Sequence, residues 1–119
     1  MLNGLRVLVV EDDPEVLSLT ALILEEEGMV VRGCSLGSEA LGAVGEFSPQ
    51  IALLDSRLPD TTGVELGREL ARRAPDCIQV LVSGDAEGIS AWVRQGHLAL
   101  PKPFEIDDLV ALVRTAAAR

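Results

Sequence analysis

The sequence has few of the residues from which thiolate or histidine sites are built. Its two cysteines, Cys34 and Cys77, lie in apolar surroundings with a spacing that fits neither a metal site nor a redox motif. We interpret both as reduced, mostly buried thiols of a cytosolic protein. His97 is the only histidine. Without a second histidine or a metal-ligand spacing, it is interpreted as a residue at a strand edge and not as a ligand or phosphoryl donor.

Long hydrophobic runs are also missing. Although 48% of the residues are hydrophobic, no apolar run approaches the roughly 20 residues of a membrane-spanning helix. The first residues lack a signal-peptide pattern, because the short apolar run that follows them ends in acids. We therefore expect a cytoplasmic protein with no membrane partner, whose apolar residues form a sheet covered on both faces.

Basic residues are scarce relative to acidic ones. The chain has 10 Lys and Arg against 19 Asp and Glu, a formal net charge of −9. A nucleic acid would be repelled by this charge, so we expect no direct nucleic-acid partner. The charge suits a protein that binds a divalent cation or a basic partner, and it suits an ordinary acidic cytosolic protein equally well.

Two kinds of segment alternate along the 119 residues. Apolar, β-branched runs predict strands at 5–10, 30–34, 51–55, 78–83 and 98–100. Helical spacing predicts helices at 14–27, 37–46, 62–73, 86–95 and 106–117. This alternation predicts one doubly wound α/β domain over residues 1–119, with a five-stranded parallel sheet and right-handed crossovers. Ligand sites in such sheets form at the carboxyl ends of the strands.

The first predicted helix illustrates the local signals. Asp13 is a plausible N-cap ahead of Pro14, and Gly28 ends the helix. Its buried face is predicted from four apolar side chains at helical spacing: Val16, Leu19, Ile23 and Leu24.

Acids follow the first and third strands. Glu11, Asp12 and Asp13 would repel a phosphate unless a cation lay between them, and carboxylate oxygens are the ligands that Mg²⁺ prefers. The alternative is a solvated acidic turn in which Asp13 caps the helix, and the local sequence does not decide between the two. Asp55 ends a run of four apolar residues, where a charge is costly without a partner. The alternative interpretation is that Asp55 is an ordinary turn residue that opens a loop.

The fourth and fifth strands add a hydroxyl and an ammonium group. Ser83 precedes a glycine, and Lys102 lies between two prolines that hold it stiffly. Ser83 alone reads as a turn residue and Lys102 as a surface lysine. Together with the acids, however, they place complementary groups at one edge of the sheet, which is hard to produce by accident.

Four motifs in this order resemble the receiver domain of bacterial two-component response regulators. They are Val-Val-Glu-Asp-Asp-Pro (9–14), Leu-Leu-Asp-Ser-Arg-Leu-Pro-Asp-Thr-Thr-Gly (53–63), Val-Ser-Gly (82–84) and Lys-Pro-Phe (102–104). The resemblance extends from Val7 to the last helix. It implies a flavodoxin-like fold with strand order 2-1-3-4-5, one receiver domain and no output domain within the sequence.

The resemblance also implies roles for particular residues. Asp55 would be the phosphoacceptor, Ser83 the switch hydroxyl and Lys102 the partner of the phosphoryl oxygens. Mg²⁺ would be held by Glu11, Asp12, Asp55 and the backbone carbonyl of Arg57. The peptide bond between Lys102 and Pro103 would be cis.

Such a protein would take its phosphoryl group from a sensor histidine kinase, a histidine phosphotransfer protein or a small acyl phosphate. It would catalyse only its own phosphorylation and dephosphorylation and pass its state to an output domain or downstream protein. A homodimer is possible, and the sequence does not decide the oligomeric state. Ala99 stands where the family usually has an aromatic residue, and the segment from Ser83 to Lys102 is a few residues short. These departures leave open a phosphate-independent scaffold; an external-substrate phosphatase is disfavoured because Arg57 stands where its second acid would be.

Overall fold

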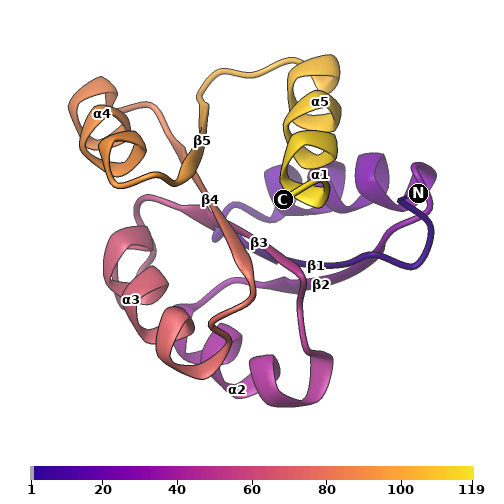
Figure 1. Ribbon diagram of the computed structural model, residues 1–119, viewed down its shortest axis with the longest axis horizontal. Helices are drawn as coiled ribbons and strands as arrows, with labels where there is room; N and C mark the ends of the chain where they lie inside the picture. Colours follow the sequence, from indigo (N-terminus) through magenta and orange to yellow (C-terminus); the bar gives the residue numbers. More distant parts are fainter. Residues whose placement is uncertain (1) are drawn as a thin grey trace.

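The structure is a computed structural model that describes residues 2–119 (Figure 1). The strands are β1 (Arg6–Val10), β2 (Val30–Cys34), β3 (Ile51–Asp55), β4 (Ile78–Ser83) and β5 (Leu98–Pro101). The helices are α1 (Pro14–Glu26), α2 (Gly37–Phe47), α3 (Gly63–Arg73), α4 (Ala86–Arg94) and α5 (Ile106–Ala117). The element order confirms the predicted alternation, and no boundary differs from its prediction by more than one residue.

The strands form one parallel sheet in the order β2-β1-β3-β4-β5. The predicted doubly wound, flavodoxin-like architecture is therefore confirmed. Figure 1 shows α1 and α5 on one side of the sheet and α2 and α3 on the other, while α4 stands apart beside β4 and β5.

Each face of the sheet has its own hydrophobic core, because successive side chains of a strand point to opposite faces. Val7, Val9 and Leu53 belong to the cluster that packs with α1 and α5. Leu8 and Leu54 belong to the cluster beneath α2 and α3. With both faces covered, β3 is buried along its whole length and β1 and β4 along all but their first residues, so polar groups reach solvent at the strand ends.

For helix α1, the predicted N-cap is confirmed, whereas the predicted buried face is partly wrong. The carboxylate of Asp13 accepts hydrogen bonds from the backbone N–H groups of Glu15 at 3.0 Å and Val16 at 3.4 Å. Leu19, expected to be buried, is 56% exposed. The buried side chains of α1 are Thr20, Ile23 and Leu24. The inner stripe thus passes through residue 20, and Leu19 lies outside it.

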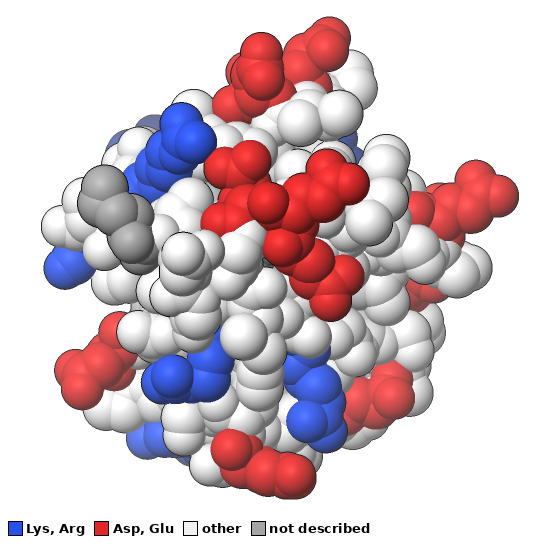
Figure 2. Space-filling model, turned by 90° about the vertical axis from the view of Figure 1, so that its right-hand side faces the viewer, with Lys and Arg blue, Asp and Glu red and all other residues white. Residues whose placement is uncertain are grey.

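Charge is unevenly spread over the surface. Figure 2 shows Asp and Glu side chains gathered across one face, with Lys and Arg lying outside this acidic area. No helix within residues 2–119 has the length and apolar character required to cross a bilayer.

Candidate functional site

Three carboxylates meet at the carboxyl edge of the sheet. Glu11 and Asp12 follow β1, and Asp55 is the last residue of β3. One oxygen of each lies within 4.8 Å of the others. Glu11 is 5% and Asp55 8% exposed, whereas Asp12 is exposed. Two buried carboxylates this close repel each other, so the site requires positive charge.

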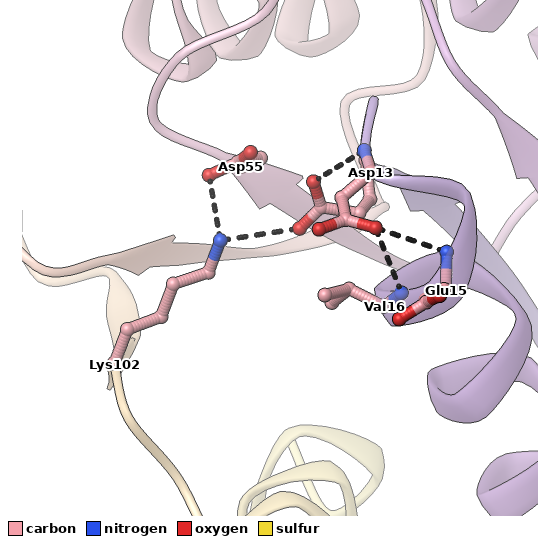
Figure 3. Close-up of polar contacts among 6 residues, drawn as sticks. Asp13, Glu15, Val16, Asp55 and Lys102 are labelled. Carbon is pink, nitrogen blue, oxygen red and sulfur yellow. Dashed lines mark hydrogen bonds and ion pairs between the residues drawn. The ribbon is translucent and has the colours of Figure 1, made fainter.

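Lys102 supplies one such charge (Figure 3). Its Nζ lies 3.2 Å from Oε1 of Glu11 and 3.3 Å from Oδ1 of Asp55. Burial alone would lower the pKa of Lys102, but the hydrogen bond to Glu11 and the charges of Asp55 and Glu11 outweigh it and raise that pKa. The backbone fixes its position, because the N–H of Lys102 donates to the carbonyl of Ser83 at 2.8 Å. The Lys102–Pro103 bond is cis, as expected.

The three consecutive acids Glu11, Asp12 and Asp13 make different contacts. The second oxygen of Glu11 accepts the backbone N–H of Asp13 at 3.0 Å, which orients the Glu11 carboxylate toward Lys102. Asp13 itself caps α1. Asp13 therefore forms the capping turn, whereas Glu11 and Asp12 belong, with Asp55, to a carboxylate cluster that could hold a cation.

Ser83 is almost fully buried, at 1% exposure. Its Oγ accepts the backbone N–H of Asp85 at 3.0 Å. An oxygen that already accepts this bond keeps its own proton free to donate elsewhere. Ser83 also lines an open hollow of ≈ 620 Å³ together with the site residues Asp12, Asp55, Arg57 and Lys102.

Arg57 lies at the rim of this hollow, with an exposed side chain. Ligation by its backbone carbonyl stays a prediction. Within residues 2–119, no ion pair joins Arg57 to Asp85, the other charged side chain beside Ser83 that lines this hollow. Asp85 instead caps α4, since its carboxylate accepts the N–H of Glu87 at 3.2 Å.

Gly63 brings the start of α3 against the end of β3. A Cβ added there would lie 2.5 Å from the carbonyl oxygen of Asp55 and 2.9 Å from Cδ1 of Leu81. Close packing therefore accounts for the glycine at this position. The position behind Asp55 therefore admits no larger side chain without displacing the loop that carries Arg57.

The thiols and the histidine take no part in this cluster. Cys34 and Cys77 are free, and burial raises the pKa of both, that of Cys77 to about 11. Both are therefore protonated and unreactive at neutral pH. His97 stacks on Trp92, with ring centroids 4.4 Å apart.

Two local relationships were missed from the sequence. One involves Asp85, whose backbone N–H donates to Ser83 and whose side chain caps α4. The cap could have been predicted, because an Asp that follows Ser-Gly directly and precedes a helical stretch is a typical N-cap signal. The other is the indole N–H of Trp92, which donates to the carbonyl of Leu98 at 2.6 Å. No sequence signal marks that bond.

The site fits a hard divalent cation. All three acidic residues offer oxygen, the ligand type that Mg²⁺ takes in proteins, and Mg²⁺ commonly uses only one or two carboxylates while keeping waters. A parallel α/β sheet with acids, a lysine and a buried hydroxyl at its carboxyl edge defines a class of α/β domain whose site could bind a metal ion.

The comparison with protein families agrees with this class. The model of the response regulator receiver domain matches residues 7–114, and the chain belongs to that family. It is the receiver domain of a two-component response regulator.

Similar curated proteins are longer regulators. The DNA-binding response regulator MtrA of Mycolicibacterium smegmatis is 33% identical over 116 residues, which are 96% of this chain and 51% of that protein. The DNA-binding transcriptional regulator NtrC of Salmonella typhimurium is 30% identical over 111 residues, 91% of this chain and 24% of that protein. The chain thus spans about half or less of these relatives.

Similar solved structures are of the same kind. A putative response regulator from Chloroflexus aurantiacus has a TM-score of 0.89 and 28% identity, covering 98% of this chain and all of that one. A CheY-like receiver domain protein from Methanospirillum hungatei has a TM-score of 0.86 and 28% identity, covering 95% of this chain and 93% of that one.

Proposed function

We propose that this chain is a phosphoacceptor switch in which Asp55 carries the phosphoryl group. The observation that supports this most is the buried carboxylate of Asp55, 3.3 Å from Lys102 and grouped with two further carboxylates at the end of a central strand. Asp55 also lines an open hollow, through which a donor phosphoryl group would have access to its carboxylate oxygen.

Each side chain has a defined part in the transfer. An oxygen of Asp55 attacks the phosphorus of the donor in line, the bond from phosphorus to the donor breaks, and an acyl phosphate forms on Asp55. The ammonium of Lys102 lies close enough to pair with the phosphoryl oxygens. The free proton of Ser83 donates to the phosphoryl group once it is attached. Water later attacks the phosphorus and releases inorganic phosphate.

Glu11, Asp12 and Asp55 would hold Mg²⁺, with the carbonyl of Arg57 as a further ligand. When bound, the ion supplies positive charge that offsets the repulsion between these carboxylates and the incoming phosphoryl group. The protein acts only on its own Asp55 and is not an enzyme with an external substrate.

The phosphoryl donor is proposed to be a phosphohistidine on a sensor histidine kinase or a histidine phosphotransfer protein in the cytoplasm. MtrA and NtrC are DNA-binding regulators much longer than this chain. By analogy, the phosphorylated state would be passed to an output domain or a downstream protein. With its net charge of −9, the receiver itself is not proposed to touch nucleic acid.

The test is the intact mass of the protein after incubation with acetyl phosphate and Mg²⁺. We expect a phosphate-sized gain that disappears in Asp55→Asn and in a magnesium-free sample. Asp76→Asn, an exposed acid remote from the hollow, is the matched control and should gain phosphate normally.

A second candidate is a phosphate-independent interaction domain. It is favoured by one observation, Ala99, which leaves β5 without the aromatic side chain usual in the family. Absence of a mass gain with acetyl phosphate and with a phosphohistidine donor, together with no binding of Mg²⁺ or beryllofluoride, would favour this candidate instead.

A further inference from the structure

The loop between β3 and α3 folds back on itself as a narrow stem. Arg57 and Thr62 face each other in an antiparallel bridge. Two backbone hydrogen bonds of 3.0 Å flank this pair, from Leu58 N–H to the Thr61 carbonyl and from Gly63 N–H to the Ser56 carbonyl. Arg57 and Thr62 are therefore the non-hydrogen-bonded pair of the stem.

This arrangement leaves the backbone carbonyl of Arg57 free. Within residues 2–119, neither a backbone N–H nor a side-chain donor reaches that oxygen. Arg57 lines the hollow together with Asp12 and Asp55. An unused carbonyl at this place can take a hard cation as its partner, and its position then depends on whatever holds the stem.

Two hydrogen bonds fix the tip of the loop on α2. The carboxylate of Asp60 accepts the N–H of Gly37 at 2.9 Å and that of Ser38 at 3.0 Å. Among the described residues, no other hydrogen bond joins the loop 56–62 to α2. The N-cap of α2, Leu36, has no side-chain acceptor of its own. The loop and the start of α2 therefore depend on each other through Asp60.

The loop also lies directly on the first residue of α2. A Cβ added to Gly37, which is buried, would lie 2.5 Å from Cγ2 of Thr61. The half-buried Leu58, which follows Arg57, packs against the hydrophobic cluster beneath α2 and α3. Contacts with α2 and this cluster thus bear on both sides of the stem that carries the free carbonyl.

We propose that Asp60 is a positioning residue for the cation site. By holding the loop on α2, it fixes the stem and with it the place of the Arg57 carbonyl relative to Asp55. Binding of Mg²⁺ and ordering of the start of α2 then favour each other. The inference rests on the proposed function for the ion and its ligands, but Asp60 bonds to α2 and is no member of the carboxylate cluster.

The affinity for Mg²⁺ tests this role. Its Kd is measured by titration followed through the amide NMR signals of residues 55–57, with thermal unfolding of each variant in parallel. Asp60→Ala removes both hydrogen bonds to α2, and we expect its Kd to be about tenfold higher, the low end of the effect of groups that orient metal ligands. Mg²⁺ demands near-ideal octahedral geometry, so a displaced carbonyl weakens its binding.

Two controls separate positioning from charge and from stability. Glu65→Gln removes one exposed negative charge from the first turn of α3. Ile51→Val removes a buried methyl group at the amino end of β3, remote from Asp55, and lowers the unfolding temperature without touching the loop. Both should change the Kd far less than Asp60→Ala does.

A charge-neutral variant tests the same contact from the side of α2. Gly37→Ala places a methyl group against Cγ2 of Thr61 and should displace the loop, so the Kd should rise although no charge is lost. The double variant Gly37→Ala/Thr61→Ser lacks that Cγ2 and should recover the affinity of Thr61→Ser alone. General destabilisation does not produce such a recovery.

The coupling has its own signal in the same titration. In the wild type, Mg²⁺ should shift the amide signals of Gly37 and Ser38 with the midpoint found for residues 55–57. In Asp60→Ala, these two signals should no longer follow the titration, because the bonds that connect them to the loop are gone.

The outcomes distinguish this inference from the proposed function. A wild-type Kd in both Asp60→Ala and Gly37→Ala would overturn the positioning role and leave the phosphoacceptor role standing. An equal rise of the Kd in Asp60→Ala and Glu65→Gln, with none in Gly37→Ala, would show an effect of charge alone and refute it too. Failure of the wild type to bind Mg²⁺ would refute both this inference and the proposed cation site.

Discussion

Asp60 caps a helix to which it does not belong: its Oδ1 lies 2.9 Å from the backbone nitrogen of Gly37, the first residue of α2. Its other oxygen accepts the N–H of Ser38 at 3.0 Å. Leu36 stands at the N-cap of α2 and offers no side-chain acceptor. The loop that begins after Asp55 is thereby tied to the start of α2, at the same carboxyl edge of the sheet.

This cap predicts a pH-dependent contribution to stability. The hydrogen bonds from Gly37 and Ser38 lower the pKa of Asp60 below its ordinary value. A carboxyl whose pKa is lower in the folded state stabilises the fold above about pH 4 and loses this effect as the pH falls through the folded pKa. Urea unfolding should therefore find Asp60→Asn less stable than the wild type at pH 7, with the difference fading in acid. A constant difference at all pH values would contradict the cap; Asp76→Asn is the control.

Gly67 is predicted to be required for packing. A Cβ there would lie 2.5 Å from Oε1 of Gln79, whose buried amide donates to the Gly67 carbonyl at 2.8 Å. We expect Gly67→Ala to lower the free energy of unfolding by about 1–3 kcal/mol, the usual effect of overpacking. Gly42→Ala is the matched control, since it lies in a helix with no atom within 4 Å of the added Cβ. It should stabilise the protein by about 0.5–1 kcal/mol; equal effects of the two would refute the packing argument.

The two neighbouring acids Asp12 and Asp13 should respond differently to magnesium. Mg²⁺ at a hundredfold excess over its Kd should stabilise the wild type by about 2.7 kcal/mol, measured as a shift in thermal unfolding. Asp12→Asn should lose most of this shift, because Asp12 belongs to the cluster of carboxylates. Asp13→Asn should keep it, since Asp13 caps α1 and Asn caps comparably. Sodium chloride of equal ionic strength is the salt control, and loss of the shift in both variants would argue against this assignment.

Lys102→Gln should destabilise the protein without magnesium and increase its response to magnesium. The change leaves Glu11 and Asp55 without the ammonium that lies 3.2 and 3.3 Å from them. Because Lys102 is about one-third exposed, we expect a loss of only about 1–2 kcal/mol at pH 7. The raised pKa of Lys102 means that its stabilisation is present throughout the neutral range and disappears only at strongly alkaline pH.

The same variant should gain more stability from Mg²⁺ than the wild type does, because no ammonium competes for the carboxylates. Thermal unfolding over a magnesium titration checks this expectation. A response to magnesium equal to or smaller than that of the wild type would show that Lys102 does not oppose the cation.

Much of the candidate site followed from the sequence because its residues stand at the ends of predicted strands. In a parallel sheet these ends share one edge, so Glu11, Asp12, Asp55, Ser83 and Lys102 could be brought together from strand order alone. The fold followed for the same reason: uninterrupted apolar runs alternate with helical stretches, and few architectures bury both.

The tertiary structure decided what depends on the docking of elements against one another. Asp60 reaches Gly37 over 23 positions and Lys102 reaches Glu11 over 91, distances that no local pattern reports. Leu19 fits the helical spacing of α1 and still lies outside the buried stripe, since the rotation of a docked helix is set by its neighbours. Local chemistry thus determined the strands, helices and strand-end groups. The caps made between elements and the hydrogen bond from Trp92 to Leu98 depended on packing, because such bonds form only where folding has already placed the partners.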